Sequence, residues 1–132
     1  MTTVSADPPA EFASKSWSND PDGGWAVFGH IGASFSGIFA PGLALMIAGR
    51  RSEYVRQHVR QSLNFQLNCV LTLIALQVLD GATGTSTGII RLIILGFGFV
   101  WPFVAATKVR KGIWNPYPQL VPLLRSLPEP LR

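Results

Sequence analysis

Three long stretches of this 132-residue chain contain no Asp, Glu, Lys or Arg, at residues 26–49, 61–79 and 92–107. A helix needs roughly 20 mostly apolar residues to cross the hydrocarbon core of a bilayer, and each stretch meets or approaches that length. A surface helix of a soluble protein carries a charged face, which none of the three does. The sequence therefore predicts an all-α integral membrane protein with three transmembrane helices.

The segment before the second stretch predicts a further element. Residues 54–66 read YVRQHVRQSLNFQ, and neither Gly nor Pro separates them from the apolar residues that follow. Such an amphipathic, Arg-rich segment is typical of a helix on a membrane surface. We expect an interfacial helix that leads directly into the second transmembrane helix.

Charge is distributed by segment, which predicts the topology. Residues 1–25 have a net charge of −3, residues 50–60 of +3, and the Pro-rich tail at 108–132 of +4. Basic residues in short loops mark the cytoplasmic side. We therefore expect a polar N-terminal tail (1–25) outside, a three-span domain (26–107), and a C-terminal tail (108–132) in the cytoplasm.

Candidate catalytic or metal-binding groups do not form any familiar pattern. The one cysteine, Cys69, lies inside the second apolar stretch, so no disulfide can form within the chain. No His pair at metal spacing, nucleophile elbow, phosphate loop or acidic pair occurs. We expect no enzyme and no cofactor. Nucleic-acid binding is not expected either, because the basic residues flank the spans and form no single patch.

Small residues recur every four positions in the first stretch. Such rows let helix backbones approach closely in lipid. They predict contact either with other helices of this chain or with a helix of a partner subunit. One row is Gly29, Ala33 and Gly37, and the other is Gly32, Ser36, Ala40, Ala44 and Ala48. His30 lies beside them, and it either bonds a neighbouring helix or belongs to a site.

A second set of residues shares one face of the helix that contains the second stretch. In lipid such a stripe must face protein or water, so it predicts a packing seam or, alternatively, a substrate or ion path. Gln66 and Gln77 lie on the opposite face, which indicates protein on two sides. The stripe comprises His58, Gln61, Phe65, Asn68 and Thr72, with Asn64 beside it.

Basic and aromatic residues mark the expected membrane boundaries. The basic residues predict contact with the headgroups of anionic phospholipids, or docking of a partner. Trp25, Trp114 and Tyr117 lie just outside the predicted spans, where aromatic belts occur. The expected headgroup contacts are Arg50, Arg51, Arg56, Arg60, Lys108, Arg110 and Lys111.

A pattern of residues between positions 29 and 118 points to a family. It comprises His30, Gly32, Pro41, Val55, His58, Gln61, Leu63, Asn64, Phe65 and Gln66, and then Ala106, Lys108, Gly112, Trp114 and Pro118. At these positions the chain resembles a widespread family of small bacterial membrane proteins of unknown function, which is distantly related to the membrane channel component of the chloroplast inner-envelope protein-import machinery. Ser62 replaces the family's usual small residue, and the tail from Gln119 is additional.

The resemblance implies a multi-pass protein of the bacterial inner membrane and carries over no reaction. Together with the small-residue rows and the polar faces, it predicts a non-catalytic accessory or assembly subunit of a larger membrane complex. The expected partners are other membrane protein subunits and anionic phospholipids. The alternative is an oligomeric channel or protein-translocation component, in which the stripe from His58 to Thr72 lines the path.

Overall fold

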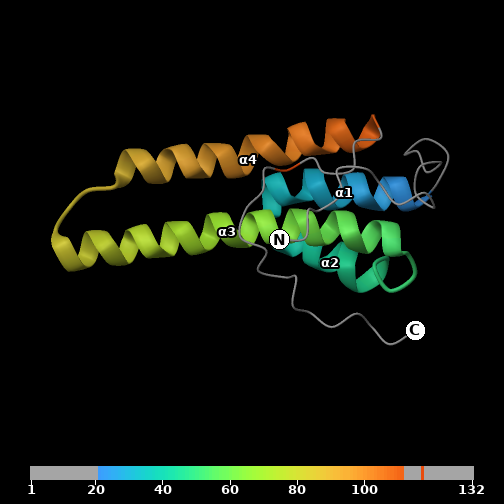
Figure 1. Ribbon diagram of the computed structural model, residues 1–132, viewed down its shortest axis with the longest axis horizontal. Helices are drawn as coiled ribbons and strands as arrows, with labels where there is room; N and C mark the ends of the chain where they lie inside the picture. Colours follow the sequence, from blue (N-terminus) through green and yellow to red (C-terminus); the bar gives the residue numbers. More distant parts are fainter. Residues whose placement is uncertain (1–20, 112–116, 118–132) are drawn as a thin grey trace, which may run out of the picture.

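The computed structural model describes residues 21–111 and Tyr117, and within them every regular element is an α-helix. The all-α prediction is therefore confirmed for this part of the chain. Two short helices lie beside one half of a pair of long antiparallel helices (Figure 1). The helices are α1 (Pro21–Ser36), α2 (Phe39–Ile47), α3 (Glu53–Thr83) and α4 (Gly88–Arg110).

The first predicted transmembrane helix is not one helix. The chain reverses after Ser36, because Gly37 has a φ of +61°, a conformation that glycine adopts at little cost. The Ser36 hydroxyl accepts a hydrogen bond from the backbone N–H of Ala40 (2.9 Å) and so caps the second helix. Pro41 lies in the first turn of α2, where its missing N–H breaks no bond. Residues 26–49 thus form a helical hairpin, and three spans are not confirmed.

The predicted continuity of the amphipathic segment with the second apolar stretch is confirmed, because both lie in α3. Ser52 caps this helix by accepting a bond from the Val55 N–H (3.4 Å). Its hydroxyl also donates to the Asp22 carboxylate (2.6 Å), so α1 and α3 begin at the same end of the molecule. The predicted external position of the N-terminal tail stays a prediction, because residues 1–20 lie outside the described part of the chain.

The opposite end of the molecule is the turn between α3 and α4. The Asp80 carboxylate accepts bonds from the N–H and the hydroxyl of Thr87, both at 3.0 Å. It also forms an ion pair with Arg91 (3.1 Å). Gly84, at a φ of +69°, ends α3 with the left-handed residue that commonly follows a helix. The α3–α4 connection is therefore held by polar contacts of its own.

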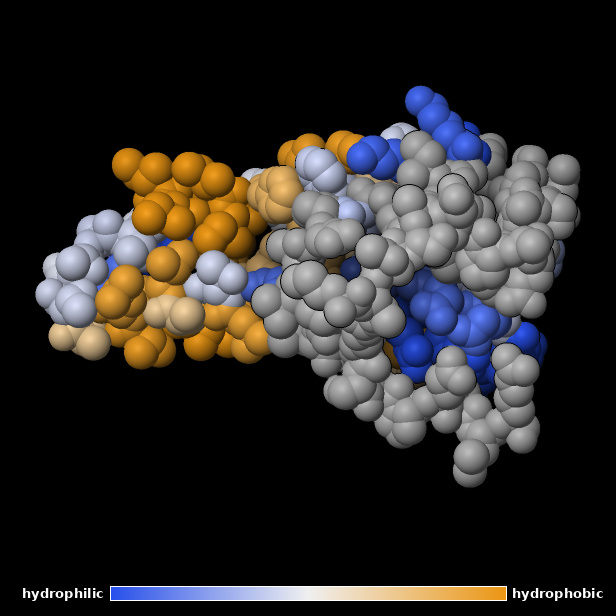
Figure 2. All heavy atoms as spheres, in the orientation of Figure 1, coloured by the Kyte–Doolittle hydropathy of each residue, from blue (hydrophilic) through white to orange (hydrophobic). Residues whose placement is uncertain are grey.

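Two helices are long and apolar enough to cross a membrane, namely α3 and α4. Only 17% of the apolar stretch of α3 and 22% of that of α4 is buried. A soluble protein would cover such surface with other elements. Figure 2 shows the apolar side chains gathered on the half where α3 and α4 run alone. Such an exposed apolar surface is the one expected of a membrane protein.

The core lies at the other half, where α1 and α2 pack on α3 and α4. Most of its apolar members are Ala or Val, and such small residues let the backbones lie close together. A Cβ on Gly29 would lie 3.0 Å from a methyl group of Val59, and a Cβ on Gly32 would overlap that of Ala40. The buried core cluster comprises Ala26, Ala44, Ala48, Tyr54, Val55, Val59 and Val109.

Candidate functional site

Four polar side chains meet inside this four-helix half. The Nδ1 atom of His30, from α1, lies 2.8 Å from the Tyr117 hydroxyl. That hydroxyl donates to the Ser62 hydroxyl of α3 (3.4 Å), and Ser62 donates to the Gly29 carbonyl (3.2 Å). The rings of His30 and His58 stand edge to face with centroids 5.6 Å apart. Both imidazoles are almost completely buried, so the cluster is internal.

Gln66 links three helices one turn deeper. Its side-chain N–H₂ group donates to the Ala33 carbonyl of α1 (3.2 Å) and to the Gly98 carbonyl of α4 (3.1 Å). The Gly98 carbonyl has no donor within α4, because Pro102, four residues further on, has no N–H. The Ala33 carbonyl also accepts the Gly37 N–H (2.9 Å). Gln66 therefore holds α1 and α4 on α3.

Tyr117 follows α4 and folds back into the cluster. Its ring packs on Phe65, with centroids 4.8 Å apart, and is tilted against His30 at 5.3 Å. This position differs from the predicted aromatic belt, because the hydroxyl bonds inside the protein. Burial raises the pKa of Tyr117 above its ordinary value, which keeps the phenol neutral and able to donate.

The cluster joins neighbouring helices through hydrogen bonds. The polar atoms of Ser62, Gln66 and Tyr117 bond carbonyls and side chains of this chain. No group of three or more His, Cys, Asp or Glu that could hold a metal occurs within residues 21–111 and Tyr117. The arrangement supplies interhelical bonds, each typically worth about 0.6 kcal/mol and at most about 1.7 in lipid.

The predicted small-residue rows lie at the contact between α1 and α2 and at the contact of this hairpin with α3. Ala33, Ala44 and Ala48 are buried, whereas Gly37 makes the turn between α1 and α2. The structure therefore places these rows in contacts within the chain, one of the two alternatives. The residues of the rows that take part in the hairpin contacts are Gly29, Gly32, Ala33, Ser36, Ala40 and Ala44.

The predicted polar stripe on α3 divides into two parts. His58 is buried beside His30 of α1, and Phe65 is buried beside Phe97 of α4 and Tyr117. Gln61 and Asn64 are half-buried. Beyond them the side chains bond their own helix: Asn68 donates to the Asn64 carbonyl, and the exposed Thr72 donates to that of Asn68, both at 2.8 Å. The structure does not bring these residues to one continuous path inside the chain.

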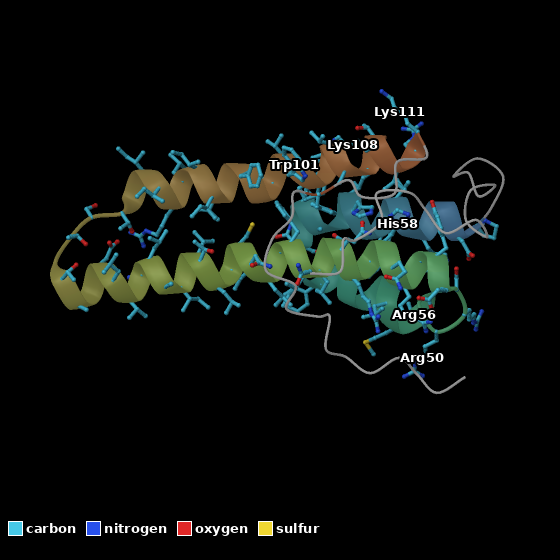
Figure 3. The ribbon with its side chains drawn as sticks, in the orientation of Figure 1. Arg50, Arg56, His58, Trp101, Lys108 and Lys111 are labelled. Atoms are coloured by element: carbon cyan, nitrogen blue, oxygen red, sulfur yellow. The ribbon has the colours of Figure 1, made fainter. Side chains whose placement is uncertain are left out.

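The seven basic residues predicted at a headgroup surface lie at one end of the molecule. Figure 3 shows Arg50, Arg56, Lys108 and Lys111 at the end where α3 begins and α4 finishes. Arg56 is paired with Glu53, and the Lys108 ammonium lies 5.2 Å from the Trp101 ring centroid. Arg50, Arg51, Arg110 and Lys111 are exposed. The end is strongly basic.

Sequence reasoning missed the roles of Tyr54, Ser62 and Tyr117. Ser62 had a usable signal, because Val55, Val59, Ser62 and Gln66 recur at helical spacing and form the face that is buried. The ring centroids of Tyr54 and His58 lie 4.6 Å apart. Tyr54 comes one residue before Val55, the first residue of that face. The return of Tyr117 to the cluster has no local signal. Trp114, Gly112 and Pro118 lie outside the described residues.

Fold and site together define a small helical membrane protein in which a helical hairpin is fastened to two apolar helices. Residues 21–124 match the magnetosome magnetite crystal formation protein family (MamF/MmsF), and the chain belongs to this family. Neither the curated proteins nor the solved structures yield a significant match. The match supports the predicted small bacterial membrane family, while the predicted relation to the chloroplast import channel stays untested.

Proposed function

We propose that this chain is a non-catalytic membrane protein that supports magnetite crystal formation by packing against other proteins of the magnetosome membrane. The proposal rests on a contrast between the polar side chains, which are bonded inside the protein, and the apolar side chains, which are exposed on its surface. The polar side chains of Ser62, Gln66 and Tyr117 are hydrogen-bonded within the chain, whereas the outer surface of α3 and α4 is apolar and uncovered.

The two-helix half is the proposed contact for a partner subunit. Gly96 is exposed there, and a Cβ at this position would meet no atom within 4 Å. A helix from another protein can approach closely at such a small residue. The side chains around it, Leu92, Ile93 and Val100, are 70%, 66% and 55% exposed, so they would surround the contact.

The basic end is the proposed cytoplasmic side, in contact with anionic lipid headgroups. Seven basic residues against Asp22 and Glu53 mark it among the described residues, whereas Asp80 and Arg91 neutralise each other at the other end. Because α1 begins and α4 ends on the same side, this proposal places both there. It replaces the predicted external N-terminal side.

The test is the replacement of Gly96 by Leu in a magnetosome-forming host that lacks the native copy. Open space in the chain at Gly96 should leave the fold intact, while the added side chain should block a partner helix. We expect loss of co-purified membrane proteins in mild detergent and altered crystal size by electron microscopy.

Gly42→Leu is the matched control, because Gly42 on α2 also has open space around its Cβ and lies outside the proposed contact. Equal co-purification and normal crystals with both variants would contradict the proposal. A homo-oligomer without other partners would instead favour the channel alternative, which no contact among the described residues supports.

A further inference from the structure

The number of helices changes along the long axis of the molecule. At the basic end, α1 and α2 lie beside α3 and α4, and beyond the hairpin turn only α3 and α4 continue (Figure 1). The Gln66 bonds to Ala33 and Gly98 mark how far the hairpin reaches. From Glu53 to Gln66 and from Gln66 to Asp80, α3 rises about 20 Å each at 1.5 Å per residue. The hairpin therefore covers about half of the length.

The outer surface of the hairpin is apolar and uncovered. No charged residue occurs in α2, and its side chains of Phe39 and Met46 are 77% and 67% exposed. Phe35 at the end of α1 is 73% exposed. An exposed surface of this kind requires lipid or protein to cover it. The start of α1 lies at the basic end of the molecule, where the Ser52 hydroxyl bonds the Asp22 carboxylate and joins α1 to α3.

We infer that the hairpin lies in one leaflet of the bilayer, so that the protein is a wedge that prefers membrane whose basic-side leaflet is convex. The occupant of the apolar hairpin surface is the acyl chains of that leaflet. Charge complementarity supports this choice, because Arg50 and Arg51 come within four residues of the end of α2 and Lys111 follows α4, which places basic groups where anionic headgroups begin.

The magnitude of the asymmetry follows from helix geometry. An α-helix with side chains is about 10 Å across, so two additional helices displace an appreciable area of lipid in one leaflet alone. Since the hydrocarbon core is about 30 Å thick, a hairpin about 20 Å deep that starts among the headgroups ends near the middle. Membrane association of helices that occupy one leaflet depends on curvature.

The first arm of the experiment measures depth. In purified protein carrying Cys69→Ala, a nitroxide is attached at Phe39→Cys and the protein is reconstituted with phosphatidylglycerol and phosphatidylcholine. We expect strong relaxation by oxygen and weak relaxation by an aqueous nickel chelate, as for a site near the bilayer centre. Accessibility of Phe39→Cys to nickel from either side would overturn the inference; access from the far side would restore a third span.

The second arm measures curvature preference. Protein labelled at Lys111→Cys, also with Cys69→Ala, is placed in giant vesicles, and membrane tubes are pulled outward. A membrane-impermeant quencher reports which molecules have the basic end outside. We expect those molecules to be enriched several-fold in the tube and the oppositely oriented ones to be depleted. Equal densities in tube and vesicle would overturn the wedge, even with a deeply placed hairpin.

A variant separates the hairpin from the rest of the molecule. Phe39→Lys with Leu43→Lys places charge on exposed hairpin positions, so the fold should persist while the hairpin leaves the lipid. We expect circular dichroism to stay helical and the tube enrichment to disappear. Unchanged enrichment would overturn the assignment to the hairpin. Both arms use purified protein, so their outcome is independent of partner binding and of the proposed function.

Discussion

The two halves of this molecule are stabilised in different ways. The four-helix half has a core made mostly of Ala and Val, and polar side chains such as Gln66 bond the carbonyls of neighbouring helices. The two-helix half has apolar residues outside, and polar contacts of Asp80 with Thr87 and Arg91 join α3 to α4 at the turn. One half is thus a small folded domain, and the other depends on lipid or a partner for its surroundings.

This difference teaches where single changes should matter. In the four-helix half, the backbones approach so closely that adding one methyl group or removing one hydrogen-bond donor should lower the stability of the fold. In the two-helix half, side chains face outward, and a change of shape meets lipid or the proposed partner. Four predictions sharpen this comparison, in order of decreasing effect on stability.

The largest effect is expected for Gly32→Ala. Its Cβ would overlap that of Ala40, so α1 and α2 must separate, at a cost of about 3 kcal/mol, the upper end for overpacking. Gly42→Ala, where no atom lies within 4 Å, is the control and should be neutral or slightly stabilising. Unfolding by SDS in mixed micelles measures both, and equal stability of the two variants would refute the hairpin contact.

Replacing Gln66 by Leu should have the next largest effect. The Gly98 carbonyl would lose its donor, because Pro102, four residues further along α4, has no N–H. The Ala33 carbonyl would keep only its bond from the Gly37 N–H, so a loss of about 2 kcal/mol is expected. Thr72→Val removes a hydroxyl that bonds only its own helix at an exposed position, and a change below about 0.5 kcal/mol is expected there. Thermal unfolding in detergent compares them, and a larger loss for Thr72→Val would reverse the comparison.

Tyr117→Phe should cost about 1 kcal/mol, since the ring remains on Phe65 while the hydroxyl bonds to His30 and Ser62 are lost. Because burial raises the pKa of Tyr117 in the folded state, stability should fall as pH rises above the unfolded pKa of about 10. The variant should lack that part of the alkaline loss. Identical pH profiles above this value would argue against a buried Tyr117 phenol.

The smallest effect is expected in the other half, for Arg91→Met. It removes the ion pair with Asp80 and the bond to Gln77, but Asp80 keeps its bonds from Thr87. We expect a loss of about 0.5 to 1 kcal/mol, as for a partly exposed pair. A loss in SDS unfolding as large as that of Gln66→Leu would mean that the two halves are equally dependent on polar contacts.

Much of the architecture could be predicted from the sequence because it depends on local pattern. The absence of Gly and Pro between Tyr54 and Leu79 predicts the continuous α3, and the apolar run before Lys108 predicts α4. The collection of basic residues at one end follows from their positions beside these helices. The pairing of His30, Ser62 and Tyr117 could not be predicted, because it joins residues up to 87 positions apart.

The sequence by itself determined that the chain is helical and has long apolar segments of the kind that cross membranes, because hydropathy and the distribution of charge are sums over neighbouring residues. Only the tertiary structure decided that residues 26–49 turn back at Gly37. An apolar hairpin and an apolar span have the same composition. The choice between them depends on contacts between distant residues, such as those of Gly29 with Val59 and of Ala33 with Gln66.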